Sequence, residues 1–168
     1  MFFLIYYACI VFFLYIWEMQ KEKTIDHALR ATWQTVAKMY NEHASKHDST
    51  MAMAFVLLNI DIEHGTPSTA LGPLMGMEPT SLSRILKSME DKGAIYREKN
   101  PDDGRGVLIK LTEFGIEKRN TSRAHVIRFN ETVKKHISEE KIKHFFEVTE
   151  TINELIINKK IFNKNSTK

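Results

Sequence analysis

The stretch that decides the fold of this 168-residue chain is residues 66–112, TPSTALGPLMGMEPTSLSRILKSMEDKGAIYREKNPDDGRGVLIKLT. All seven glycines and all four prolines of the chain lie between Gly65 and Gly115. Glycine and proline interrupt regular structure more strongly than any other residues. The sequence therefore predicts a turn-rich central module between two long helical flanks.

A short helix is predicted at the start of this module. Thr66 is a good cap residue, and Pro67 suits the first position of a helix, where a backbone N–H would have no partner. The helix is expected to end near Met75, because Gly76 permits a sharp turn there.

A second helix and a hairpin are predicted after that turn. The pair Glu78-Pro79 opens the helix in the same way, and Gly93 ends it. Two short helices around a tight turn are typical of a helix-turn-helix. Residues 94–98 and 107–111 are strand-like runs around the polar loop NPDDGRG, a pattern that predicts a β-hairpin.

The N-terminal flank is predicted to hold two helices. Residues 24–46 carry apolar side chains at three- and four-residue spacing, which indicates an amphipathic helix. Residues 51–64 form a second helix, capped by Ser49 or Thr50 and ended by Gly65. Its middle is apolar on nearly all sides, so we expect it to lie centrally.

The C-terminal flank is also predicted to be helical. Thr112 is a good cap for a helix that runs to about His136. Ser138 precedes a last helix with acidic residues in its first turn and a clean apolar stripe. From Lys159 onward the chain is rich in Lys and Asn, which indicates a flexible tail.

Composition limits the possible functions only loosely. The formal charge of +3 permits a nucleic-acid partner without requiring one, and residues 66–112 hold seven basic against six acidic side chains. The single cysteine, Cys9, excludes a disulfide framework and a cysteine-based zinc site. These features indicate a reducing, cytoplasmic compartment.

Residues 2–17 form an uninterrupted apolar and aromatic run. At sixteen residues the run is short for a membrane-spanning helix, which needs about 20. Lys21 and Lys23 would place its C-terminal side in the cytoplasm. Three hypotheses stay open: a non-native leader before a true start at Met19, a membrane anchor, or an extension of the first helix.

The helix that begins at Pro79 has the side chains of a DNA-recognition helix. At about 100° per residue, one side is apolar, consisting of Leu82, Ile85, Leu86 and Met89. The opposite side carries hydroxyls and two cations, namely Thr80, Ser81, Ser83, Arg84, Lys87 and Ser88. Arginine can bind guanine bidentately, hydroxyls bind bases or phosphates, and lysine binds phosphates. Together with the preceding turn and the hairpin, this face predicts contact with a major groove.

The hairpin tip offers a second contact. Arg105 lies between Gly104 and Gly106, where little side-chain bulk hinders its approach to DNA. A single arginine on a narrow ribbon can enter a minor groove, where the negative potential is enhanced. Asp103 is placed to pair with Arg105 and hold it in one orientation.

The central motifs resemble those of the MarR-type winged helix-turn-helix regulators. The matching residues are LGPLMGMEPTSLSRILKSMEDKGAI for the helix-turn-helix and NPDDGRGVLIKLTEFG for the wing and its L-T-x-x-G exit. The resemblance covers about residues 24–157. Pro73 departs from it in the first short helix, and residues 1–17 have no counterpart in the family.

The resemblance implies a mainly α fold with a small β-hairpin wing, in which long dimerisation helices flank the winged helix-turn-helix. The expected parts are a hydrophobic leader (1–18), N-terminal helices for dimerisation and core (19–64), a DNA-binding lobe (65–112), C-terminal dimerisation helices (113–158) and a tail (159–168). It further implies a homodimeric transcriptional regulator, a repressor, that binds double-stranded DNA at a pseudo-palindromic operator. A small-molecule, aromatic effector would release it, from a pocket between the dimer helices and the DNA-binding lobe.

Other functions have weaker support. The main alternative is a membrane-anchored sensor or adaptor that inserts residues 2–17. His43 and His47 have a spacing that suits a metal, but no further ligand is evident nearby, so we expect no metal site. Signatures of hydrolases, phosphate-binding loops and metalloproteases are missing, so we expect neither an enzyme nor a cofactor. Aromatic and Met residues of the first two helices are candidates for lining an effector pocket: Trp33, Met39, Tyr40, Met51, Met53 and Phe55.

Overall fold

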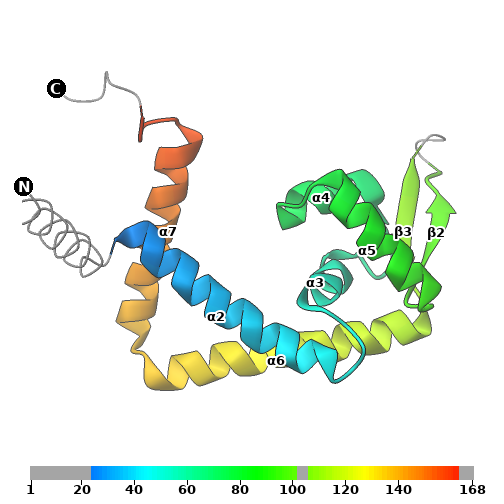
Figure 1. Cartoon of the computed structure of the whole chain (residues 1–168), viewed down its shortest axis with the longest axis horizontal. Coiled ribbons are helices and arrows are strands. Elements are labelled where there is room, and N and C mark those ends of the chain that lie inside the picture. Colours follow the sequence, from blue (N-terminus) through cyan, green and yellow to red (C-terminus); the bar gives the residue numbers. More distant parts are fainter. Residues whose placement is uncertain (1–23, 102–105, 163–168) are drawn as a thin grey trace, which may run out of the picture. The chain divides into compact units, whose positions relative to one another are not determined.

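The computed structural model describes residues 24–101 and 106–162, and its fold is mainly helical with a small antiparallel sheet (Figure 1). The chain divides into two compact units, Met1–Val56 and Leu57–Lys168. The predicted fold class is confirmed, because a helix-turn-helix precedes a two-stranded wing within the second unit. The leader of residues 1–18 lies outside the described residues.

Helix α2, Ile25–Ser45, and helix α3, Met51–Asn59, follow the two predicted N-terminal helices. Thr50 is the residue that caps α3, because its Oγ1 accepts a hydrogen bond of 3.2 Å from the Met53 N–H. Asn41 Oδ1 accepts a further bond of 3.0 Å from the Met51 N–H. Together these two side chains satisfy two of the N–H groups that the first turn of a helix leaves unpaired.

Helix α3 ends at Asn59, five residues before the predicted end, and local side-chain bonds explain the difference. The Asp61 carboxylate accepts hydrogen bonds from the backbone N–H groups two and three residues later. The bond from the His64 N–H is the main reason why the pKa of Asp61 lies below its usual value. Thr66 Oγ1 accepts from the Asp61 N–H at 2.9 Å and donates to the Asn59 carbonyl at 3.3 Å. These bonds compete with continued helix, and Gly65 (φ +76°) completes the turn.

The predicted role of Thr66 as a helix cap is wrong, because Thr66–Pro67 form a short strand, β1, instead. Its side chain is buried, and its hydroxyl forms the two hydrogen bonds of the turn described above. Helix α4, Ser68–Met75, begins one residue later than predicted and takes Pro67 as its N-cap. Gly76 ends α4 in the left-handed conformation (φ 59°), as predicted, and α4 remains a single helix in spite of Pro73.

The sheet has three strands in the order β1-β3-β2. Strands β2, Ile95–Lys99, and β3, Val107–Leu111, form the predicted hairpin, with Ile95 opposite Leu111 and Lys99 opposite Val107. Strand β1 pairs with the other edge of β3, so that Thr66 lies opposite Ile109. Strand β1 was not predicted, because a two-residue strand that contains proline has no alternation of apolar and polar residues.

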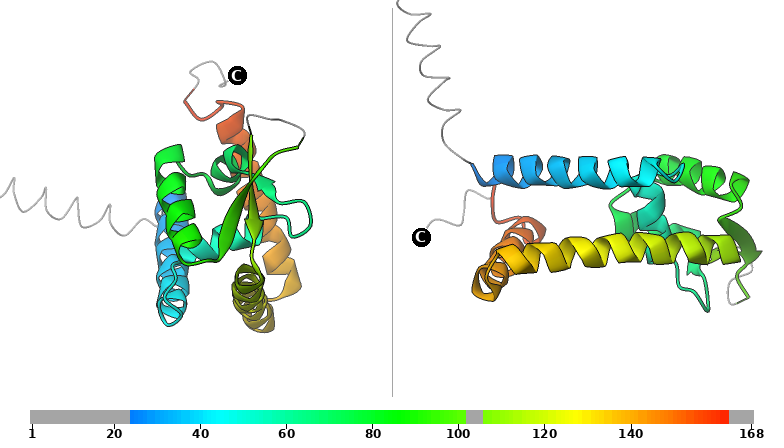
Figure 2. Two further views of the ribbon diagram at one scale, coloured as in Figure 1. Left: turned by 90° about the vertical axis from the view of Figure 1, so that its right-hand side faces the viewer. Right: turned by 90° about the horizontal axis from the view of Figure 1, so that it is seen from below.

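The second helix of the helix-turn-helix is α5, Pro79–Asp91, which packs beside α4 and β2 (Figures 1 and 2). Pro79 is its first residue, as predicted, and Gly93 (φ +69°) follows its end. Its inner side buries Leu82, Leu86 and Met89. Burying each such side chain contributes about 1.5–3 kcal/mol. The remaining buried apolar residues of the second unit are Leu57, Ile60, Leu71, Ala94, Ile95, Leu108, Ile109 and Leu111.

A tight joint connects the sheet to helix α6, Glu113–His136, and explains the L-T-x-x-G motif. Thr112 Oγ1 donates to the Gly93 carbonyl at 2.6 Å and accepts from the Gly115 N–H at 3.0 Å, so Thr112 caps α6 as predicted. Gly115 approaches the backbone so closely that an added Cβ would lie 1.9 Å from the Ala94 carbonyl oxygen. The glycine of this motif is therefore required by space.

The last helix, α7, is Glu139–Ile157, and Ser138 is its N-cap as predicted. No residue of α7 or of α2 is buried. Both helices nevertheless carry apolar stripes, which amphipathic helices normally bury against a partner.

Substituting Gly115 tests the joint. We expect Gly115→Ala to lower the free energy of unfolding by more than about 3 kcal/mol, because the new methyl group meets backbone that has no room to move. Gly76→Ala is the control: it strains a left-handed residue with open space around it, at a cost of about 1–2 kcal/mol. Equal melting temperatures of the two variants in calorimetry would contradict the close packing.

Substituting Thr66 tests the turn that ends α3. Thr66→Val keeps the shape of a buried side chain but removes both of its hydrogen bonds, so we expect a loss of about 1–3 kcal/mol in urea unfolding. Thr132→Val, at an exposed position of α6, should change stability by less than about 0.5 kcal/mol. A Thr66→Val variant with unchanged stability in urea unfolding would show that the turn does not depend on the hydroxyl.

Candidate nucleic-acid interface

Helix α5 brings all six of its predicted DNA-binding residues to the surface. The side chains of Thr80, Ser81, Ser83, Arg84 and Lys87 are exposed, and Ser88 is half-buried. The buried residues of α5 hold the helix on the body of the second unit and leave this polar face outward. Because an α-helix fits the major groove, the face is accessible in the way that base recognition requires.

The two cations of this face are available to bind DNA. Among the residues that the structure describes, neither Arg84 nor Lys87 has a carboxylate within ion-pair distance. Their charge is therefore not neutralised locally, and both can exchange water and counterions for phosphates or bases. Glu90, on the last turn of α5, is instead held by an ion pair with Arg97 of β2, with 3.0 Å between Oε2 and Nε.

The wing is a regular ladder up to its tip. The Asn100 N–H donates to the Gly106 carbonyl at 3.0 Å, one step beyond the pairing of Lys99 with Val107. The predicted tip residues Asp103 and Arg105 lie outside the described residues. Their roles in the minor groove stay predictions.

Two ion pairs at the wing escaped the sequence analysis. Arg97 pairs with Glu90, and Lys110 Nζ lies 3.3 Å from Glu98 Oε1 across the two strands. The alternation of side chains along β2 could have predicted the pair of Arg97 with Glu90. Ile95 is buried, and residues two apart in a strand point to the same side, so Arg97 points to the side of the core and α5.

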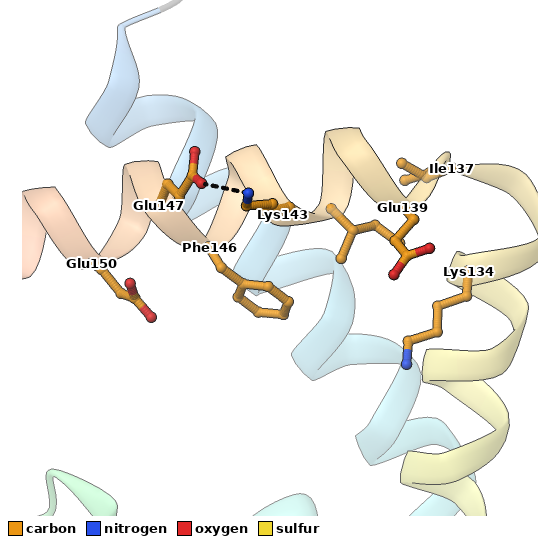
Figure 3. Close-up of a pocket in the computed structure, with 8 residues that line it drawn as sticks. Lys134, Ile137, Glu139, Lys143, Phe146, Glu147 and Glu150 are labelled. Carbon is orange, nitrogen blue, oxygen red and sulfur yellow. Dashed lines mark ion pairs between the residues drawn. The ribbon is translucent and has the colours of Figure 1, made fainter.

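A second surface feature lies where α6 turns into α7. A cavity of about 640 Å³ opens there, and Figure 3 shows side chains that line it, among them Phe146 and the ion pair of Lys143 with Glu147 (3.8 Å). It is lined by Lys134, Ile137, Glu139, Ile142, Lys143, Phe146, Glu147 and Glu150. This mixture of apolar and charged side chains resembles the composition of a protein–protein contact surface.

The predicted effector-pocket residues do not line this cavity. Trp33 and Phe55 lie against each other in the first unit, with ring centroids 6.3 Å apart. Burial raises the pKa of the Tyr40 hydroxyl. The effector stays a prediction.

Among the described residues no three His, Cys, Asp or Glu side chains cluster as metal ligands would.

Comparison with known proteins identifies the family. A sequence profile of the MarR family matches residues 50–107, which span α3, the helix-turn-helix and most of the wing. The HTH-type transcriptional regulator SarZ of Staphylococcus haemolyticus is 30% identical over 111 residues, or 66% of this chain and 76% of that protein. The chain belongs to the MarR family. The multiple antibiotic resistance protein MarR of Escherichia coli is 35% identical over 78 residues, which cover 46% of this chain and 54% of MarR.

Solved structures of MarR-family regulators share the fold. The S. aureus MepR–DNA complex aligns with a TM-score of 0.72 at 20% identity, over 80% of this chain and all of MepR. A mutant of E. coli MarR in complex with operator DNA aligns with a TM-score of 0.68 at 23% identity, over 76% of this chain and 92% of that one.

Membership of the family settles the class of protein. The chain is a DNA-binding transcriptional regulator with a winged helix-turn-helix, and not an enzyme. Residues 2–17, on which the membrane-anchored alternative depends, lie outside the described residues. Within the described residues no helix has the length and apolar character needed to span a bilayer.

Proposed function

We propose that this MarR-family regulator binds a pseudo-palindromic operator as a homodimer, with α5 in the major groove, and represses the gene behind it. The observation that carries the proposal is the two-sided character of α5. Leu82, Leu86 and Met89 are buried, whereas the opposite face presents hydroxyls and two cations. A bound dimer on a promoter would exclude RNA polymerase, which is the simplest route to repression.

Each polar residue of α5 has a role that follows from its chemistry. Arg84, at the centre of the face, is proposed to bind guanine through its two terminal nitrogens. Thr80, Ser81 and Ser83 would bind base edges or phosphates near the start of the helix, and Lys87 would bind a phosphate. Half-buried Ser88 would bind the backbone at the edge of the groove.

The wing is proposed to add a contact in the adjacent minor groove. The support is that β2 and β3 pair regularly as far as Lys99 and Val107, which gives the hairpin a rigid stem. In the sequence Arg105 follows closely, between two glycines, with Asp103 nearby to orient it.

Binding to DNA tests the role of Arg84. The full chain would be used to select a duplex from a random pool, and its affinity measured by fluorescence anisotropy at two salt concentrations. We expect Arg84→Ala to weaken binding by about 1–3 kcal/mol and to relax the base preference at one position in each half-site, because a bidentate guanine contact is lost.

Arg128→Ala is the matched control for this experiment. It removes the same charge from an exposed site on α6, and should lower only the general electrostatic attraction. Equal losses in the two variants would show that Arg84 contributes charge and not recognition. Equal affinity of the unmodified chain for selected and scrambled duplexes would overturn the proposed function.

The homodimer is supported by apolar surface that one chain leaves uncovered. On α2, Ile25 is 66% exposed and Trp33 is 51% exposed. On α7, Phe145, Phe146 and Ile156 are each more than half exposed. Exposed apolar surface on this scale marks an interaction site in soluble proteins. We propose that a second copy covers it and fills the cavity at the α6–α7 turn.

A two-fold dimer dictates the spacing of the operator. Two copies of α5 that enter the same face of DNA require half-sites about one helical turn, or roughly 10 base pairs, apart. The two half-sites would be inverted copies of one sequence, because the two recognition helices are related by the same two-fold axis.

Substitution on α7 tests the dimer. We expect Phe145→Glu to shift the chain from dimer to monomer in analytical ultracentrifugation, because it places a charge in a surface that would otherwise be desolvated. Operator affinity should fall with it, since two linked half-sites bind more tightly than one.

Thr151→Glu is the matched control, since it adds the same charge to the polar side of the same helix. It should leave the sedimentation coefficient unchanged. A monomeric unmodified chain at micromolar concentration would refute the proposed dimer, and so would a Phe145→Glu variant that stays dimeric.

A further inference from the structure

The ion pair of Glu90 and Arg97 connects the recognition helix to the wing. Glu90 lies on the last turn of α5, and its Oε2 is 3.0 Å from Arg97 Nε on β2. Only a short turn separates the two elements, closed by bonds from the Gly93 N–H to the Glu90 carbonyl and from the Ala94 N–H to the Met89 carbonyl, each of 2.9 Å.

The pair acts at the middle of the wing and not at its base. Arg97 is the third residue of β2 and lies opposite Ile109, while Ile95 at the base is already held in the core. Core packing at the base constrains rotation of the hairpin about that base less than a contact further along the strand does. The ion pair is such a contact and resists this rotation.

The pair contributes little to the stability of the fold. Both side chains are 39% exposed, and ion pairs of this exposure are worth roughly 0–1 kcal/mol. Its significance is therefore geometric: it selects one direction of the hairpin relative to α5.

We propose that Glu90 and Arg97 are positioning residues that set the angle between α5 and the wing, so that both elements fit one operator half-site. This inference rests on the proposed function of α5 as the recognition helix. Without the pair, the hairpin would sample several directions, and binding would have to select one of them.

The charge of Glu90 makes the inference testable by the sign of the effect. Glu90 is an acid at the end of the helix proposed to enter the groove, so it repels phosphates. By charge alone, Glu90→Gln would tighten binding to every DNA sequence. If the pair positions the wing, Glu90→Gln should instead weaken binding to the operator, and it should not weaken binding to scrambled DNA.

The experiment compares Glu90→Gln with Asp91→Asn in the full chain. Asp91 is the adjacent exposed acid, and among the described residues it has no basic side chain within ion-pair distance. We expect Glu90→Gln to weaken operator binding about three- to thirtyfold, with melting temperature and scrambled-DNA affinity maintained. Asp91→Asn should bind both duplexes at least as tightly as the unmodified chain.

A charge swap provides a second variant. Glu90→Arg combined with Arg97→Glu restores an ion pair with the net charge of the unmodified chain, so we expect it to recover most of the operator preference that Glu90→Gln loses. The swap has one positive charge fewer than Glu90→Gln, which by charge alone would weaken its binding to DNA, so recovery cannot come from the change in total charge.

Three results would overturn the inference: tighter operator binding by Glu90→Gln, parallel to Asp91→Asn; equal losses on operator and scrambled DNA; or a charge swap that recovers nothing. Failure of the proposed function looks different, because the unmodified chain itself would then show no preference for the selected operator.

Discussion

The close contact between Gly115 and the Ala94 carbonyl is the constraint on which the DNA-binding half of the molecule depends. At this point the turn after α5, the start of β2, the end of β3 and the first turn of α6 meet. Thr112 joins them by donating to that turn and by capping α6. Because nothing larger than hydrogen fits at Gly115, the elements can meet without a gap, and the start of α6 and the hairpin share a single rigid joint.

The proposed interface for DNA depends on this joint and on the two faces of α5. Burial of three apolar side chains fixes the rotation of the helix about its axis, and this rotation points Arg84 and Lys87 to solvent. The wing is then oriented by its base in the core and by the ion pair of Glu90 with Arg97. The residues proposed for recognition and the residues that stabilise the fold are thus different side chains of the same helix, so a substitution on the polar face removes none of the buried contacts.

The places where sequence reasoning failed have a common physical cause. The end of α3 and strand β1 both depend on Thr66, whose hydroxyl bonds to Asp61 and Asn59. A threonine followed by proline matches a helix cap equally well, and only the position of β3 beside it makes the extended conformation preferable. The pair of Glu90 and Arg97 was missed similarly, because it spans a turn whose geometry local patterns do not specify.

The sequence by itself determined the order and type of the main elements, the glycine-dependent turns, the cap Thr112 and the outward face of α5, and it narrowed the cap of α3 to Ser49 or Thr50. These features depend on periodicity and local backbone chemistry, which a single chain segment carries within itself. Only the tertiary structure decided that Thr66 belongs to a strand, that Gly115 is required by space and that Glu90 connects α5 to the wing. Each of these depends on a contact between segments distant along the chain or joined by a turn, and the free energy of such contacts exists only once the elements have packed together.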